Sequence, residues 1–488
     1  MKKLLMAVAA VAAFGAFGKT YYVDGSVEAS GDGSKDSPFK TVEAGIAAAV
    51  NAGDVVEIAK GTYTLTAIQT LSKAITVKGA TGNRDDVTVS GGGKYTCFKF
   101  AGAGATVANL TIANGTSSAG QSGGCVNFAA LGVVSNCVIK GGALYNSGCA
   151  IAAYVDKSSL IIDSVIKGNT AYFNGAASGG MVVHVASGSL VRTLVVGNGK
   201  GNIVNFDDPS IVSLNSGLID HCTIANNTCA KSALFVNNST ACTVRDTIVW
   251  GNTAIRETRA GAPNVSGIGA SAKISHLCTL GSFGTDPVNG NPSFVDQANG
   301  DYSLSAASPC IGAGTDGSDI GAVPYDATKG TVGMSVSAYG GNDSVEVTHT
   351  LVAGGGWTLD GATVRWAFDG RALAAEEEGD ATGTEVTHTY AAGVYSPTAY
   401  VLMDGAAEEI KVSLPKTIDV RWTGTADVSE TSAKSLAELV KTAGDGATVN
   451  VAEGTYPLTE CLNVVKSVKI VGTGSRDNTK ITSTSRCF

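Results

Sequence analysis

The stretch NLTIANG, residues 109–115, is the first of six copies of one strand-like phrase, and this repetition decides the fold class. The other copies are NCVIKGG from Asn136, DSVIKGN from Asp163, RTLVVGN from Arg192, HCTIANN from His221 and DTIVWGN from Asp246, with a worn seventh, HLCTLGS, from His276. They follow one another at intervals of about 25 to 30 residues, which is the signature of a solenoid that adds one structural unit per period.

The aliphatic residues around each phrase indicate which solenoid this is. One lies two residues before the first polar residue, as in Val107, and another lies three residues after it, as in Ile112. Counted from the first polar residue of each copy, the inward positions are −2, +1 and +3. Positions +1 and +3 alternate as in one strand, but −2 and +1 are an odd number of residues apart, so the backbone must bend at the polar residue. We therefore predict a parallel β-helix with the polar residue at a corner of each rung; Gly, Asn and β-branched residues argue against a helical repeat.

Composition agrees with stacked strands and limits the partners. Of the 488 residues only 16% are charged, while 63 are Gly and 10 are Pro, which suits strands joined by tight turns. A net charge of −8 argues against nucleic acid, because such proteins need a basic face. Beyond the N-terminus no apolar run approaches the length of a membrane span.

The N-terminus predicts export. Lys2 and Lys3 precede an apolar run from Leu4 to Phe17, which is typical of a bacterial secretory signal. We assign residues 1–18 to a signal peptide and expect a secreted or cell-surface protein.

Eleven cysteines in an exported chain suggest disulfides, although an odd number leaves at least one unpaired. Cys125 and Cys149 occupy equivalent places in GGCVNF and SGCAIA and could bond across adjacent rungs, whereas Cys137 and Cys222 share an inward repeat position. We favour most cysteines as small apolar residues of the interior. The spacing fits no zinc motif, and we expect no metal and no cofactor.

The segment before the repeats predicts a cap. Val42, Ile46 and Val50 recur every four residues, so residues 40–51 are expected to form a short amphipathic helix that covers the open end of the coil. With Pro38, Phe39 and the run GDVVEIAKGTY, this segment resembles the opening module of secreted pectin-lyase-like proteins, and the resemblance implies a right-handed coil over residues 19–325.

Residues 291–323 carry Gly300-Asp301-Tyr302, Ser308-Pro309 and Asp319-Ile320-Gly321, and they resemble the choice-of-anchor Q module that closes such coils. We expect an irregular last rung and a C-terminal cap here. Calcium could be imagined between Asp296, Asp301, Asp316 and Asp319, but their spacing fits no compact loop, and we favour structural turns.

Two further segments follow. Residues 326–417 alternate as short strands of an antiparallel sandwich, and Trp366 to Gly370 with THTY at 387–390 resemble elements of PKD-type immunoglobulin-like domains. Residues 418–488 repeat the sequence pattern of the opening module, and Cys487-Phe488 corresponds to Cys97-Phe98. We predict the start of a second coil and expect the sequence to be a fragment of a longer protein.

The corner column carries the candidate ligand-binding residues. Stacked rungs should place Asp163, Arg192, His221 and Asp246 in one row, either as a polar ladder or as donors and acceptors facing a sugar chain. His221 is the group suited to proton transfer near neutral pH, and His184 is a weaker candidate. Asp207-Asp208 is the nearest approach to paired catalytic acids, but strand neighbours point to opposite faces.

Two functions stay open. One is a non-catalytic adhesive stalk that binds an extracellular polysaccharide or surface glycan, and the other is a polysaccharide lyase or glycoside hydrolase. The 6% aromatic content, with Trp250 as the one tryptophan of the coil, favours the first, since sugar clefts usually need several stacking rings. Fold analogy alone cannot decide between them.

Overall fold

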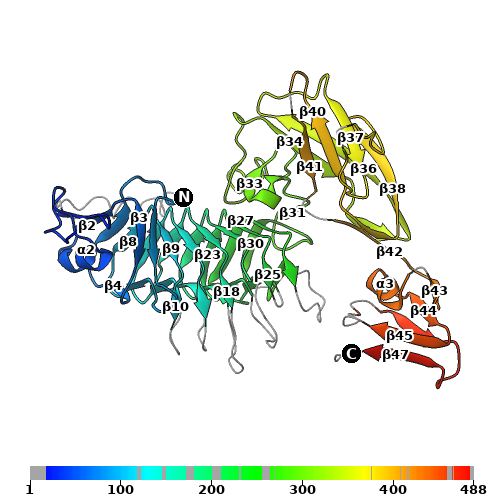
Figure 1. Cartoon of the computed structure of the whole chain (residues 1–488), viewed down its shortest axis with the longest axis horizontal. Coiled ribbons are helices and arrows are strands. Elements are labelled where there is room, and N and C mark those ends of the chain that lie inside the picture. Colours follow the sequence, from blue (N-terminus) through cyan, green and yellow to red (C-terminus); the bar gives the residue numbers. More distant parts are fainter. Residues whose placement is uncertain are drawn as a thin grey trace. The chain divides into compact units, whose positions relative to one another are not determined.

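The computed structural model describes thirteen stretches of the chain and one single residue (Figure 1). They are residues 18–117, 123–144, 150–171, 181–199, 210–229, 232–254, 264–269, 271–374, 376–406, 408–414, 417–432, 434–458, 464 and 467–483. They form two compact units. Unit 1 runs to Pro292 and resumes at Pro309–Pro324, whereas unit 2 comprises Ser293–Ser308 and the chain from Tyr325 onward.

Unit 1 is a parallel β-helix, as predicted, and its strands stack in long parallel ladders (Figure 1). The first ladder contains β1 (Thr20–Val23), β2 (Val55–Ile58), β5 (Thr76–Gly79), β8 (Ala105–Ala108), β12 (Gly132–Ser135), β16 (Leu160–Ile162), β20 (Ser189–Val191), β23 (Gly217–Asp220) and the first parts of β27 (Cys242–Trp250) and β30 (Lys273–Thr279). Past the corner the second ladder contains β3 (Gly61–Thr64), β6 (Val87–Ser90), β9 (Thr111–Ala113), β13 (Val138–Lys140), β17 (Val165–Lys167), β21 (Leu194–Val196), β24 (Thr223–Ala225), the ends of β27 and β30, and β31 (Val288–Asn289).

The third side of the coil is a separate ladder. It contains β4 (Gln69–Leu71), β7 (Phe98–Phe100), β11 (Val126–Phe128), β15 (Ala150–Val155), β19 (Met181–Val185), β22 (Val212–Leu214), β26 (Leu234–Val236) and β29 (Val265–Ser266). Short parallel strands lie between the second and third sides: β10 (Thr116–Ser117), β14 (Ala143–Leu144) and β18 (Thr170–Ala171), and then β25 (Thr228–Cys229) with β28 (Thr253–Ala254).

The predicted corner is a left-handed backbone position in every copy of the repeat. The φ angles are 58° at Asn109, 47° at Asn136, 52° at Asp163, 43° at Arg192, 48° at His221, 49° at Asp246 and 48° at His276. Asn, Asp and His are enriched in this region relative to other side chains, so Arg192 is the corner residue that occupies it at a cost in backbone strain. The strand register pairs the residue two positions before each corner with its counterpart in the next rung, beginning with Val107 and Val134. The corner residues are therefore superposed from rung to rung, as predicted.

The inward positions make the core of the coil. The residues at −2 and +3 of the six full copies, from Val107 and Ile112 to Val244 and Val249, have no exposed surface. A buried asparagine ladder runs beside them, in which three side-chain amides donate to the amide oxygen of the next rung at 2.9–3.0 Å, and a fourth, Asn252, donates to Asn264 of its own rung at 3.1 Å. Its members are Asn169, Asn198, Asn227, Asn252 and Asn264. The ladder satisfies polar groups that the tight turns would otherwise leave buried without partners.

The described cysteines are buried, which agrees with the prediction that most of them fill the interior. They are Cys97, Cys125, Cys137, Cys222, Cys229, Cys242, Cys278 and Cys310. The rung neighbour of Cys125 is Cys97, and contact with Cys125 together with burial raises the pKa of the Cys97 thiol well above its usual range. Cys149 lies outside the described residues, as do Cys461 and Cys487.

The cap helix is shorter than predicted. α2 (Val42–Ala48) begins after Thr41, whose hydroxyl accepts from the amide of Ala44, and packs Val42 against the first rungs. Val50 is 58% exposed, so its assignment to the apolar face is wrong. The reason is that the chain leaves helical geometry at Ala49, which ends the four-residue period before Val50.

The expected closing module, residues 291–323, divides between the two units. Pro309–Pro324, which we call the strap, packs on the coil of unit 1. Ser293–Ser308 forms β32 (Phe294–Asp296), η1 (Gln297–Asn299) and β33 (Asp301–Leu304), and it bonds to the sandwich through Ser293 and Met334. The antiparallel pairing of β32 with β33 separates this segment from the parallel coil.

Unit 2 contains a β-sandwich of short sheets. Its strands are β34 (Thr331–Val336), β35 (Gly340–Asn342), β36 (Ser344–Gly354), β37 (Thr363–Ala367), β38 (Glu385–Ala391), β39 (Gly393–Tyr395), β40 (Thr398–Leu402), β41 (Ile410–Ser413) and β42 (Ile418–Arg421). All pair antiparallel except β35 with β42. Trp366, Phe368, Tyr390 and His349 pack together in its core, and burial lowers the pKa of His349 to about 4.

The chain after the sandwich restates the opening of the coil. β43 (Thr425–Val428), β44 (Thr448–Val451) and β46 (Lys469–Gly472) pair in parallel like β1, β2 and β5, and β45 (Gly454–Leu458) pairs with β47 (Thr479–Ser483) like β3 with β6. α3 (Leu436–Lys441) corresponds to α2. The boundary between the sandwich and the second coil, expected at residue 418, lies after β42, because Ile418 and Val420 belong to the core of the sandwich. Cys487-Phe488 lies outside the described residues.

Candidate functional site

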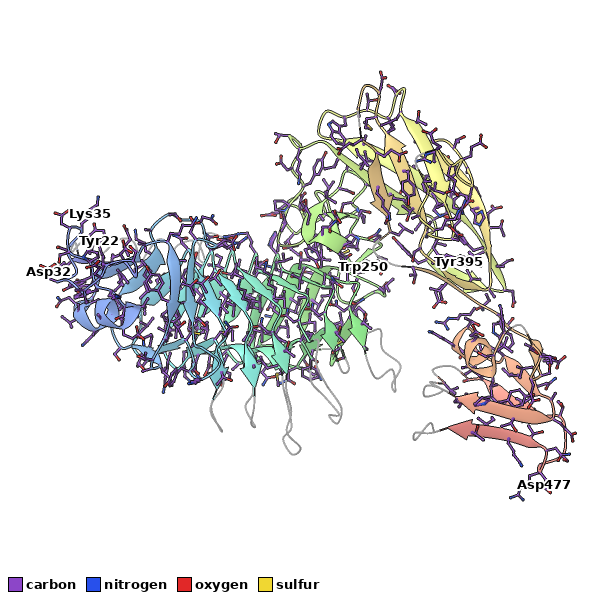
Figure 2. All side chains as sticks on the ribbon, viewed as in Figure 1. Tyr22, Asp32, Lys35, Trp250, Tyr395 and Asp477 are labelled. Carbon is purple, nitrogen blue, oxygen red and sulfur yellow. The ribbon has the colours of Figure 1, made fainter. Side chains whose placement is uncertain are left out.

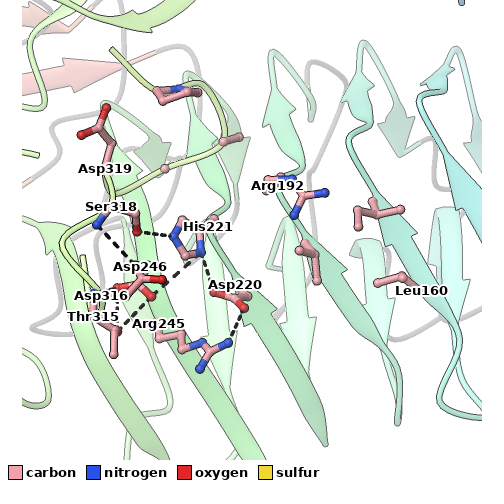
Figure 3. Close-up of a pocket in the computed structure, with 15 residues that line it drawn as sticks. Leu160, Arg192, Asp220, His221, Arg245, Asp246, Thr315, Asp316, Ser318 and Asp319 are labelled. Atoms are coloured by element: carbon pink, nitrogen blue, oxygen red, sulfur yellow. Dashed lines mark hydrogen bonds and ion pairs between the residues drawn. The ribbon is translucent and has the colours of Figure 1, made fainter. Parts of the chain in front are cut away.

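A pocket of about 550 Å³ lies where the corner column of the coil meets the strap (Figure 3). The strap is held there by hydrogen bonds from the amide of Gly321 to the carbonyl oxygen of Asp246 and from the amide of Ala322 to the hydroxyl of Thr223. The pocket is lined by Leu160, Ile162, Val191, Arg192, Asp220, His221, Arg245, Asp246, Thr315, Asp316, Ser318, Asp319, Gly321, Ala322 and Pro324.

His221 occupies the centre of the polar part of this pocket. It stands at the corner between β23 and β24, where its left-handed backbone turns the ring outward. Nδ1 lies 2.7 Å from Oδ1 of Asp220, and Nε2 lies 2.9 Å from Oγ of Ser318 on the strap (Figure 3). The hydrogen bond to Asp220 raises the pKa of His221, an effect that outweighs the loss of hydration on burial.

Asp220 is buried beneath His221. Burial alone would raise the pKa of its carboxyl, but the hydrogen bonds from His221 and Arg245 lower it below the usual value. Nη2 of Arg245 donates to Oδ2 of Asp220 at 2.6 Å from the next rung, where the two residues are in register. Asp220 is therefore held ionised between two positively polarised partners.

Asp246 anchors the strap. Its Oδ1 accepts from the backbone amide of Thr315 at 2.8 Å, and the Thr315 hydroxyl lies 2.9 Å from each carboxylate oxygen. Its oxygens are 3.9 Å from Nδ1 of His221 and from Nδ1 of His276. With 1% of its surface exposed, Asp246 fixes the strap against the coil instead of facing solvent.

A metal ion is the alternative reading of this cluster. Asp220, His221 and Asp246 offer ligand atoms within 4.8 Å of one another. Both oxygens of each carboxylate and both ring nitrogens, however, already engage the donors and acceptors of Arg245, Thr315 and Ser318 or one another. The donor set fits a hydrogen-bonded cluster better than a cation cage.

The four acidic residues considered for calcium serve local turns. Asp296 accepts from the amide of Asn299, and Asp301 accepts from the amide of Ser303. On the strap, Asp316 accepts from the amide of Ser318, and Asp319 accepts from the amide of Gly312.

The structure brings together three of the four predicted site residues. Arg192, His221 and Asp246 line the pocket, one rung apart along the column. Asp163 lies outside the lining and forms a two-point ion pair with Arg192, with Nε to Oδ1 at 2.7 Å and Nη2 to Oδ2 at 2.9 Å. Asn136 likewise donates to Asn109 at 3.0 Å, so part of the column is the polar ladder considered from the sequence.

Sequence reasoning missed Asp220, Arg245, Thr315 and Ser318. A signal for the first two existed, because the residue just before each corner is uncharged in the other copies and becomes Asp220 and then Arg245 in consecutive rungs. Such opposite charges in register predict a cross-strand pair. The two strap residues carried no comparable signal, since nothing in the sequence says where the strap returns to the coil.

The two weaker candidates lie elsewhere. His184 is buried on β19, where it packs edge-on against Tyr154 at 5.3 Å between ring centroids, and burial lowers its pKa. Asp207-Asp208 lies outside the described residues. Trp250 is fully buried in the coil, so it offers no ring to a sugar (Figure 2).

In the described part of the chain, no helix has the length and apolar character needed to cross a membrane.

Comparisons with known proteins do not identify a family for this chain. No protein-family model and no curated protein matches the sequence. Among solved structures, the chain is similar to the pectate lyase Pel9A, at 15% identity over 64% of this chain and 97% of that one, with a TM-score of 0.35. It is also similar to a rhamnogalacturonan lyase, at 14% identity over 57% and 91%, with a TM-score of 0.29. These scores are too low to carry an argument, so the parallel β-helix rests on the strand register described above.

Proposed function

We propose that the protein is exported and binds an extracellular polysaccharide in the pocket between the corner column and the strap. The observation that carries this proposal is the pocket itself, about 550 Å³, into which consecutive rungs and the strap project donors and acceptors beside an apolar wall. The mixture suits a sugar ring, which presents hydroxyls at its edge and C–H groups on its faces.

Arg192 is the side chain best placed to recognise an acidic sugar. Its side chain is 47% exposed, and its pair with Asp163 uses Nε and Nη2, so Nη1 takes no part in that pair. A guanidinium can accept a second carboxylate at such a position. On the opposite side of the pocket, the hydroxyls of Thr315 and Ser318 can exchange hydrogen bonds with sugar hydroxyls.

The apolar wall replaces the missing aromatic platform. Leu160, Ile162 and Val191 line the pocket from β16 and β20, and no Phe, Tyr or Trp is among the lining residues, all of which are described. Aliphatic contact contributes less than ring stacking. We therefore expect modest affinity at a single pocket, and an adhesive role would need several contacts along the polymer.

Binding to a panel of neutral and acidic polysaccharides tests the proposal. Arg192→Asn should weaken binding to an acidic polymer by about tenfold, or about 1.4 kcal/mol, because it removes the exposed guanidinium but keeps a residue suited to positive φ. Lys157→Asn is the matched control, since Lys157 is an exposed cation of the coil with φ 56° outside the pocket.

Three outcomes are informative. Weaker binding of the Arg192 variant alone supports the pocket. Equal binding of all three proteins would place the glycan elsewhere. Release of unsaturated ends, measured by absorbance in the same assay, would replace simple binding with the lyase alternative, in which His221 or Arg192 would remove the proton beside a uronate carboxylate.

A further inference from the structure

We propose that Ser318, His221 and Asp220 hydrolyse carboxylic esters as a nucleophile, a general base and the carboxylate that orients that base. This activity goes beyond glycan binding, and its restriction to esters carried on a polysaccharide rests on the proposed function. The three residues meet in the order that acyl transfer needs, with Ser318 Oγ 2.9 Å from Nε2 of His221 and Asp220 Oδ1 2.7 Å from Nδ1 (Figure 3).

The proton positions follow from the partners. Asp220 is ionised, since the bonds from His221 and Arg245 lower its pKa, and an ionised carboxylate can only accept. Nδ1 of His221 must therefore carry the proton. In the neutral ring, Nε2 is then the acceptor, and the hydroxyl of Ser318 is its donor. This is the tautomer that a general base requires.

The surrounding chain holds each group in place. Arg245 fixes Asp220 from the next rung, and the left-handed corner fixes the ring of His221. Ser318 sits in a tight turn of the strap, where its carbonyl oxygen accepts from Gly314 at 2.7 Å and its amide donates to Asp316 at 3.3 Å. The nucleophile and base come from different segments, and both are anchored by hydrogen bonds that do not involve each other.

The rest of the pocket fits an ester. Leu160, Ile162 and Val191 give the apolar wall that an acyl group or a methyl group prefers over water. Arg192 lines the same pocket one rung from His221 (Figure 3), and its guanidinium is a cation of the pocket that could stabilise an oxyanion on the ester. We assign Arg192 that stabilising role.

The step balances without a further reactant except water. Ser318 Oγ bonds to the acyl carbon as its proton passes to Nε2 of His221, and the ester C–O bond breaks as His221 gives that proton to the leaving sugar oxygen. Water then attacks the acyl-serine and loses a proton to His221, which returns it to Ser318 Oγ. The products are a carboxylic acid and a free hydroxyl.

Three probes test the assignment on the full chain. p-Nitrophenyl acetate and an O-acetylated polysaccharide measure ester cleavage, and a fluorophosphonate measures the nucleophile, since it bonds to an activated serine and releases fluoride. We expect turnover of both esters and mass addition at the peptide that contains Ser318. Ser318→Ala and Asp220→Asn should each lower kcat by about 10,000-fold or more. The rate should rise with pH through the raised pKa of His221.

Ser72→Ala is the matched control, because Ser72 is an exposed serine of the coil outside the pocket, and this variant should retain full activity and full labelling of the Ser318 peptide. The assignment is overturned if Ser318→Ala keeps the parent rate, or if the parent neither turns over an ester nor reacts with the fluorophosphonate. Ester cleavage without polysaccharide binding would support the Ser318, His221 and Asp220 assignment and overturn the proposed glycan function. Polysaccharide binding without ester cleavage would support the glycan function and overturn the assignment.

Discussion

A corner residue of this coil has two tasks, since it must adopt a left-handed backbone and its side chain joins the column that faces outward. Asn109 and Asn136 meet both demands with a type suited to positive φ. Arg192 adopts the left-handed backbone at a cost in strain, and the two-point ion pair of its side chain with Asp163 offsets that cost. Strain of this kind points to a residue retained for what its side chain contacts.

The charged groups around His221 make stability depend on pH. Those that act on its ring are Asp220, Asp246 and Asp316, while Arg245 acts on Asp220. Because the pKa of His221 is raised on folding, its contribution is complete below the ordinary value near 6.5 and is lost as pH rises through the folded pKa. Asp220 has a lowered pKa, so its contribution is present above its ordinary value near 3.8 and is lost as pH falls through the folded pKa.

His221→Asn tests this linkage. Asn keeps the left-handed corner but removes the titrating ring, so the parent should exceed the variant in free energy of unfolding by more at about pH 5.5 than at about pH 8. Denaturant unfolding at the two pH values measures the difference. A constant difference across this range would mean that the contact between His221 and Asp220 does not depend on the charge of the ring.

At the scale of the element, each short strand has an inward and an outward side that the repeat distinguishes. On β17, Ile166 is fully buried in the coil and Lys167 is exposed. Both residues pair in parallel register with their counterparts on β13 and β21. The same substitution at these two neighbouring positions therefore compares the inner face of the strand with its outer face.

Ile166→Asp should abolish soluble expression, because an unpaired charge in this interior costs several kcal/mol, more than a single rung can absorb. Lys167→Asp introduces the same side chain on the outer side and should change the free energy of unfolding by less than about 1 kcal/mol. Expression level and thermal unfolding measure both variants. Equal damage from the two substitutions would reverse the assignment of the inner and outer faces.

At the scale of the whole molecule, the chain contains separate hydrophobic cores. One fills the coil of unit 1, another fills the sandwich, and a third lies beneath α3 in the restarted coil. Separate cores predict separate cooperative transitions.

Trp366→Ala tests this division. Trp366 is fully buried in the sandwich, and its truncation should cost about 3–5 kcal/mol, which lowers the melting temperature of the sandwich alone in calorimetry. Trp357→Ala is the matched control, since that ring is 44% exposed. Ester cleavage and glycan binding should persist in both variants below the first transition, because the pocket belongs to unit 1. A shift of every transition by the Trp366 variant would show that the units unfold together.

Much of the fold was determined by the sequence itself, because a β-helix is built from local rules applied repeatedly. The period of the repeat, the inward triplet and the polar corner residue predicted the ladders around Ile112 and the bend at Asn109, and the duplicated opening module predicted the second start at β43. Each of these features depends on strand alternation between near neighbours, which a one-dimensional pattern records. The cap helix ended early because Ala49 left helical geometry, a detail that periodicity does not contain.

The candidate site was decided by the tertiary structure. Repeat spacing placed His221 in a column with Arg192 and Asp246, but it gave no means of finding Ser318, which lies 97 residues further along the chain. The strap leaves the parallel register, passes through no copy of the repeat and is fixed on the coil by bonds to Asp246 and Thr223. Where an irregular segment docks depends on the summed contacts of a folded surface, and no local period encodes that sum.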